Sequence, residues 1–140
     1  MTKAELLAYL RGHKLAVVGS IGPDGAPQAA LVGVAVTNEF EVVFDTVTTS
    51  RKHANIRSDP RVSVTWSGPG EQTVQYEGRA AEVGGPEAEP YKQAYYQAWP
   101  DGPSRANWPN LAYIRVRPVW ARYSDYDRGP LIAEFAWPSA

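Results

Sequence analysis

The 140-residue chain has no cysteine, only two histidines and one methionine. Without cysteine, disulfides and thiolate metal sites are excluded, and the sequence has no metalloprotease or calcium-loop signature. No run of residues approaches the roughly 18 apolar positions of a membrane span, and residues 1–14 lack the apolar core of a signal peptide. We therefore expect a cytoplasmic protein with no metal site and no membrane contact.

An excess of charge of one sign is also missing, because 14 Lys and Arg stand against 15 Asp and Glu. General binders of nucleic acid carry a pronounced basic excess, so no nucleic-acid partner is expected and any basic site must be local. The length fits one compact domain that buries about two-thirds of its unfolded surface. Since nothing marks a linker, we expect a single domain over residues 1–140.

Alternating, β-rich segments separated by turn residues dominate the chain. Thr2 and Glu5 form a capping box before a short helix, and Pro60 stops a later one. Gly78 is a candidate bulge within a strand. Strands are expected at 14–21, 26–36, 40–46, 61–66, 71–83, 111–124 and 130–137, and further helices at 48–58 and 86–99. Antiparallel strands with inserted helices predict a mainly β fold, a small β-barrel.

The segment from Thr46 to Lys52 places four hydroxyl side chains and two cations at a predicted strand-to-helix junction. Cations are unfavourable at the positive end of a helix dipole unless an anion lies between them and the exposed amides. Hydroxyl donors, helix amides and charge-assisted bonds from Arg51 and Lys52 suit a phosphate group. The spacing leaves one alternative open, an ordinary N-cap at Thr48 or Thr49 with solvated cations.

Small residues follow one predicted strand, at Ala29, Ala30, Gly33 and Ala35. They allow a flat ligand to approach the backbone, and tight packing against another strand would produce the same pattern. Aromatic residues in the region 95–108 are candidates to line a pocket beside Ala30 and Ala35, which would suit an apolar or planar substrate. A core or subunit contact is the alternative for each of them.

His13 and His53 are the only histidines. Neither has an acid or a nucleophile at a telling spacing, so both are interpreted as structural or exposed residues. Ser20 and Ser50 have no supporting signature of a catalytic triad. No residue is therefore identified as catalytic.

The order of elements and their motifs resemble the pyridoxamine 5′-phosphate oxidase-like family, the FMN-binding split barrels of Greek-key type. The match runs through GAPQAALVGVAV, FDT, SRKHANI, DPRVSV and VQYEGRAAEV, over nearly the whole chain. The resemblance implies a homodimer with FMN at the subunit interface. The implied cofactor residues are Ala30, Leu31, Val32 and Gly33 beneath the ring, Thr46, Ser50, Arg51 and Lys52 at the phosphate, and Thr73 from the other subunit, with Gln72 and Gln75 as its neighbours.

The chain departs from the vitamin B6 oxidases of that family, which carry an Arg and a Lys where Ala30 and Ala35 stand. The family's C-terminal Arg-Leu-His-Asp-Arg run is also missing. If the protein is an enzyme, the resemblance thus implies an FMN-dependent oxidoreductase whose substrate is not pyridoxamine phosphate. Two alternatives stay open: a reductase that uses the deazaflavin F420, whose longer tail would lie near Arg57, Arg61 and Lys14, or a non-catalytic flavin- or heme-binding module.

Overall fold

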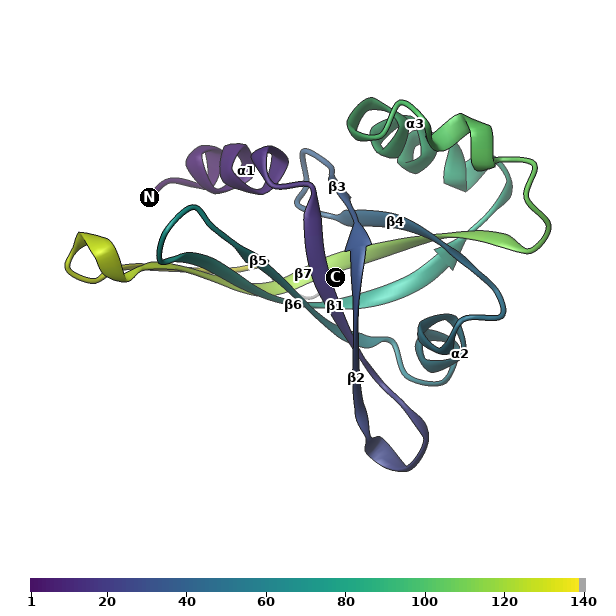
Figure 1. Cartoon of the computed structure of the whole chain (residues 1–140), viewed down its shortest axis with the longest axis horizontal. Coiled ribbons are helices and arrows are strands. Elements are labelled where there is room, and N and C mark those ends of the chain that lie inside the picture. Colours follow the sequence, from purple (N-terminus) through teal and green to yellow (C-terminus); the bar gives the residue numbers. More distant parts are fainter. Residues whose placement is uncertain (139–140) are drawn as a thin grey trace.

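The computed structural model describes residues 1–138 and shows a strongly curled antiparallel sheet with three α-helices at its margins (Figure 1). The helices are α1 (Lys3–Gly12), α2 (Arg51–Ser58) and α3 (Glu89–Ala98). The strands are β1 (Leu15–Ile21), β2 (Pro27–Gly33), β3 (Ala35–Val36), β4 (Val42–Val47), β5 (Arg61–Ser67), β6 (Gln72–Val83), β7 (Leu111–Asp125) and β8 (Leu131–Ala136).

The strand order is β2-β1-β5-β6-β7-β4-β3, and β8 pairs with β7. Strands β2 and β3 follow each other in the chain yet lie at opposite ends of this order, so the sheet curls until its two edges approach. The backbone N–H of Val34, between them, donates to the carbonyl of Lys14 at 2.8 Å. Because β4 lies beside β7, strands β4 to β7 have the order of a Greek key. The predicted mainly β split barrel is confirmed.

Apolar side chains fill the inside of the curl. Phe44, Trp66 and Tyr76 are among the largest fully buried ones, and the rings of Trp66 and Tyr76 meet edge to face at 5.8 Å. A second cluster, including Val43 and Tyr113, lies on the outer side of the sheet beneath α3. The first cluster includes Val18 of β1, Val32 of β2 and Ile56 of α2, so it holds the hairpin and this helix at a margin of the barrel, where the candidate site lies.

Two of the boundaries that differ from the expected ones lie beside the candidate site. The strand expected over 26–36 is broken at Val34, because its two halves pair with different neighbours. The helix expected from residue 48 begins at Arg51, since Thr48 donates to Asn110 at 2.8 Å and Ser50 to Val47 at 3.0 Å in a turn. The capping box at the first helix and the bulge at Gly78 are present. Across residues 1–138, no helix is long and apolar enough to cross a lipid bilayer.

Candidate cofactor site

The junction between β4 and α2 gathers the predicted hydroxyl groups. Thr46 is buried at the end of β4, and its Oγ1 lies 2.9 Å from Oγ of Ser50. Ser50 is the N-cap of α2 and accepts from the backbone N–H of His53 at 3.2 Å, so the alternative N-caps at Thr48 and Thr49 are wrong. One hydroxyl of the Thr46–Ser50 pair keeps a proton to donate. The amides of the first two helical residues have no acceptor within the helix.

A small pocket of about 80 Å³ lies between the start of α2 and the β1–β2 hairpin. Arg51 and Lys52 line it together with Ala30, so the structure brings both predicted cations to one of the residues expected beneath a ring. The remaining lining residues are Val18, Ser20, Gln28 and Ala29. Of the described residues that line it, none is acidic. This donor set suits an anion with several acceptor oxygens, such as a phosphate.

Asn55 is a part of the site that the sequence did not reveal. It is only 5 % exposed, and its Nδ2 donates to Oγ of Ser20 at 3.0 Å and to Oε1 of Gln28 at 2.9 Å. Helix α2 is thereby tied to both strands of the hairpin. Oε1 of Gln28 accepts from Asn55, and its Nε2 lies against Gly22 in the turn of the hairpin. Ser20 and Gln28 are directly opposite each other in the strand register. Alternation of side chains along the two strands would have indicated that they share one face of the hairpin.

A contact between a buried histidine and an exposed glutamate also fixes the first turn of α2. Nε2 of His53 lies 2.6 Å from Oε1 of Glu82 on β6, and His53 is 4 % exposed. The acid is 29 residues away in the chain, so spacing alone gave no hint of it. His13 has a different environment, with Nδ1 at 2.7 Å from the carbonyl of Tyr9 and the two rings stacked.

Beyond Ala30, the residues expected beneath a ring have separate environments. Leu31 is 66 % exposed and lines a hollow of about 630 Å³ with Val17 and Trp99. Val32 packs against the core. At Gly33 the close approach is used by the protein itself, since Nε1 of Trp99 donates to the carbonyl of Val34 at 3.0 Å and its ring lies against the glycine. The glycine thus packs against a tryptophan at the end of α3, whereas the alternative expected from the sequence was packing against another strand.

Replacing Gly33 with alanine tests this packing. An added Cβ would lie 2.6 Å from the Trp99 ring, so the ring must shift and its hydrogen bond must lengthen. We expect the free energy of unfolding to fall by about 1–2 kcal/mol, with a change in tryptophan fluorescence. Gly84→Ala is the matched control, because a Cβ there meets no atom within 4 Å. Equal stability of the two variants would contradict the packing role.

Thr73 is not brought to this cluster. It lies at the far end of β6 from Glu82, roughly 30 Å away along the strand, and its Oγ1 is 2.9 Å from Oγ of Ser124. Gln72 and Gln75 occupy the same end of β6. A role for Thr73 through a second subunit stays a prediction.

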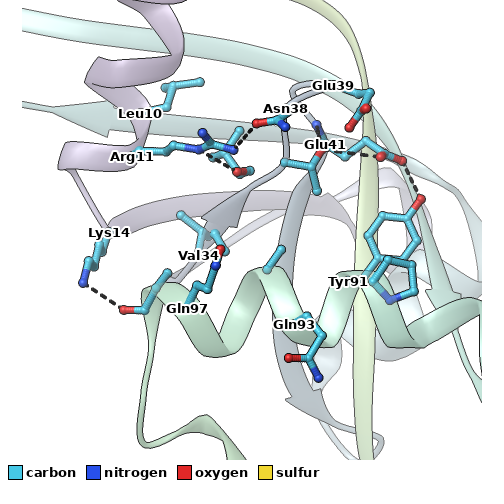
Figure 2. A pocket seen from close by; sticks show the side chains of 16 residues that line it. Leu10, Arg11, Lys14, Val34, Asn38, Glu39, Glu41, Tyr91, Gln93 and Gln97 are labelled. Carbon is cyan, nitrogen blue, oxygen red and sulfur yellow. Dashed lines mark hydrogen bonds between the residues drawn. The ribbon is translucent and has the colours of Figure 1, made fainter.

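A groove of about 910 Å³ lies between α1, α3 and the β3–β4 hairpin (Figure 2). Ala35 lines this groove and Ala30 lines the pocket at α2, so the two alanines do not share a substrate pocket. The polar groups of the groove bond to one another: Lys14 donates to the carbonyl of Ala98 at 2.8 Å, and Tyr91 donates to Glu41 at 2.8 Å. Burial and this carboxylate raise the pKa of Tyr91.

The aromatic residues expected to line a pocket also separate. Tyr95 is buried beneath α3, where its hydroxyl donates to Asp45 at 3.3 Å, and burial raises the pKa of Tyr95 to about 12. The hydroxyls of Tyr96 and Tyr113 lie 2.7 Å apart. Trp108 is 54 % exposed. Core packing therefore explains the two tyrosines.

The three cations considered for a longer cofactor tail are dispersed. Lys14 belongs to the groove between α1 and α3, and Arg57 is exposed in the last turn of α2. Arg61 forms a short ion pair with Asp59, with Nη2 at 2.6 Å from Oδ2, which lowers the pKa of Asp59 to about 2. Lys14 therefore does not extend the Arg51 pocket.

This chain has the fold of the split-barrel proteins. Its sheet is a curled Greek key, and a helix that starts with hydroxyl and cationic side chains lies at the margin of the sheet. The chain belongs to the pyridoxamine 5′-phosphate oxidase family, whose model matches residues 2–125. No curated protein sequence matches it.

Solved structures show the same fold. A conserved hypothetical protein from Mycobacterium tuberculosis is 25% identical with a TM-score of 0.74, over 88% of this chain and 84% of that one. A heme binding protein from Mycobacterium smegmatis is 16% identical with a TM-score of 0.80, over 97% of this chain and 59% of that one. An F420 reductase is 23% identical with a TM-score of 0.65, over 81% and 93% of the two chains. The fold is therefore shared by proteins with different ligands.

Proposed function

We propose that the protein binds FMN and that its phosphate lies at the start of α2. The observation that carries this is that Arg51 and Lys52 line one pocket without an acidic residue among its described lining, at the helix start that the Thr46–Ser50 hydroxyl pair caps. Two cations at the positive end of a helix become favourable when a dianion lies between them and the amides. Gln28, fixed by Asn55, is part of the wall of this pocket.

The proposed assembly is a homodimer with the cofactor at the subunit interface. Leu15, Val17 and Leu31 are 56 %, 40 % and 66 % exposed on β1 and β2, and Val17 is directly opposite Leu31. Such neighbouring exposed apolar residues favour burial against another surface. Thr73, remote from the α2 pocket of its own chain, would reach the cofactor from a second copy.

The proposed activity is that of an oxidoreductase. The FMN-loaded protein would act in the cytoplasm on a substrate other than pyridoxamine phosphate. The bound flavin would supply the redox chemistry, and the protein would supply position and electrostatics. Ala30 cannot bind a substrate phosphate by charge, and Ala35 lines a different concavity. The absence of cysteine agrees with a reducing compartment.

Purification followed by absorption spectroscopy and ligand titration tests the proposal. The flavin spectrum of the purified protein, or a saturable FMN titration with quenching of flavin fluorescence, is the expected result. Tighter binding of F420 than of FMN would identify the deazaflavin as the cofactor of this site. A protein that binds neither would overturn the proposal.

Heme is the second candidate ligand, and one observation favours it. His13 lines the hollow that contains Leu15, Val17, Leu31 and Trp99, and its Nδ1 lies 2.7 Å from the carbonyl of Tyr9. A histidine whose Nδ1 is held in this way presents Nε2 to a metal. A Soret band on heme addition that is lost in His13→Ala would support this candidate; an identical spectrum in that variant would exclude His13 as the ligand.

A further inference from the structure

Three arginines lie directly opposite one another on the adjacent strands β5, β6 and β7. The register pairs Arg61 with Arg79 and Arg79 with Arg117, and all three are exposed. Side chains paired in this way share one face of the sheet with Cβ atoms about 5 Å apart, and like charges so placed repel one another. This arginine row costs stability unless an anion lies against it.

Carboxylates neutralise the two ends of the row. Asp59 accepts from Nε and Nη2 of Arg61 at 3.0 and 2.6 Å. Glu41 lies 3.9 Å from Nε of Arg117 and already accepts the hydroxyl of Tyr91 at 2.8 Å.

The middle of the row is different. In residues 1–138, Arg79 has no carboxylate within ion-pair distance. Glu77 stands two residues before Arg79 on the same face of β6 and lines the same pocket, but it forms no ion pair with Arg79 among the described residues. An anion from outside the chain would therefore find one guanidinium that is in no ion pair, with a further cation on each side.

The arginine row borders a concavity. A pocket of about 620 Å³ is lined by Arg61, Arg79 and Glu77 and by the apolar side chains of Ile21, Pro27 and Val119. Small residues form its floor and leave space above the sheet: Gly19 lies against Ser63, and Ala29 is directly opposite Gly19. The pocket shares Ser20, Gln28 and Ala29 with the Arg51 pocket.

We propose that Arg79 binds a carboxylate or phosphate group of a small ligand whose apolar body lies in this 620 Å³ pocket. An arginine side chain holds either group by two parallel hydrogen bonds, and the flanking arginines add favourable charge. The group has two sources, a separate anionic molecule such as a substrate, or the tail of a cofactor longer than FMN. Only the second source rests on the proposed cofactor function.

Arg79→Gln tests the site, with Arg128→Gln as the matched control. Arg128 is an exposed arginine in the turn Tyr126–Arg128, so it loses the same charge away from the row. The first probes are phenyl phosphate and benzoate, titrated by calorimetry into the protein as purified and with FMN added. The second comparison measures the affinity for F420 against the affinity for FMN. We expect Arg79→Gln to weaken the binding of the affected probe by about tenfold or more, while Arg128→Gln leaves its binding unchanged.

Each source gives its own pattern. If Arg79→Gln weakens the binding of phenyl phosphate or benzoate and leaves FMN and F420 binding unchanged, the ligand is a separate anionic molecule. If it weakens F420 binding and leaves FMN binding unchanged, the ligand is a cofactor tail. No difference from Arg128→Gln with any probe, or no binding of any probe by the wild type, overturns the proposal. A wild type that binds phenyl phosphate but not FMN counts against the cofactor function alone.

Stability without ligand provides a second readout. Because Arg79 is repelled by both neighbours, Arg79→Gln should raise the melting temperature of the ligand-free protein, and added salt should diminish the increase. A lower melting temperature would make Arg79 a structural partner of Glu77 and overturn the proposal. A change in sedimentation mass would assign the anion to a second copy of the chain and overturn it as well.

Discussion

Replacing both Arg51 and Lys52 with alanine is expected to weaken FMN binding by at least about 100-fold. Each charge-assisted hydrogen bond to a phosphate contributes roughly 1.5–3 kcal/mol, and these two side chains are the cations that line the pocket at α2. The fold should survive, because Arg51 is exposed, Lys52 is partly exposed, and both stand at the unfavourable end of the helix dipole. Titration followed by flavin fluorescence measures the affinity, and circular dichroism the fold.

Two controls separate a phosphate site from a general charge effect. Riboflavin has no phosphate, so the double substitution should change its affinity little. Arg57→Ala removes a cation from the last turn of the same helix and should leave FMN affinity nearly unchanged. If the double variant binds FMN as the wild type does, the phosphate is not at the start of α2.

The fold was predictable to the extent that local patterns decide it. Alternation along residues 61–66 and 71–83 gave strands that are present, and the bulge at Gly78 lies where the glycine indicated. The break at Val34 was not predicted, because Gly33 before it also fits a continuous strand with a close approach, and only closure of the barrel decides that β2 and β3 lie at opposite edges.

The candidate site divides in the same way. Contiguous residues such as Ser50, Arg51 and Lys52 can be found from sequence because a strand end and a helix start hold them together. Asn55 and the His53–Glu82 pair cannot, since their partners come from strands distant in the chain. The arginine row needs the register across three strands, which no single segment encodes.

Replacing Asn55 with leucine is the second large expected effect, and it acts on the support of the site. Leucine has a similar size but donates nothing, so Ser20 and the amide oxygen of Gln28 lose their partner in a largely buried place. An unsatisfied buried polar group costs about 1–3 kcal/mol. We expect the free energy of unfolding to fall by about 3 kcal/mol, measured by urea denaturation, whereas Asn107→Leu in an exposed loop should change it little.

FMN affinity should fall in Asn55→Leu as well, although Asn55 does not line the pocket. Its two hydrogen bonds join α2 to both strands of the hairpin, so without them the α2 cations and Gln28 are held together for only a fraction of the time. The apparent dissociation constant rises in inverse proportion to that fraction. Combining Asn55→Leu with Gln28→Leu then distinguishes support from direct contact. If Asn55 acts through Gln28, the double variant should lose less FMN affinity than the two single losses added together; full additivity would contradict this coupling.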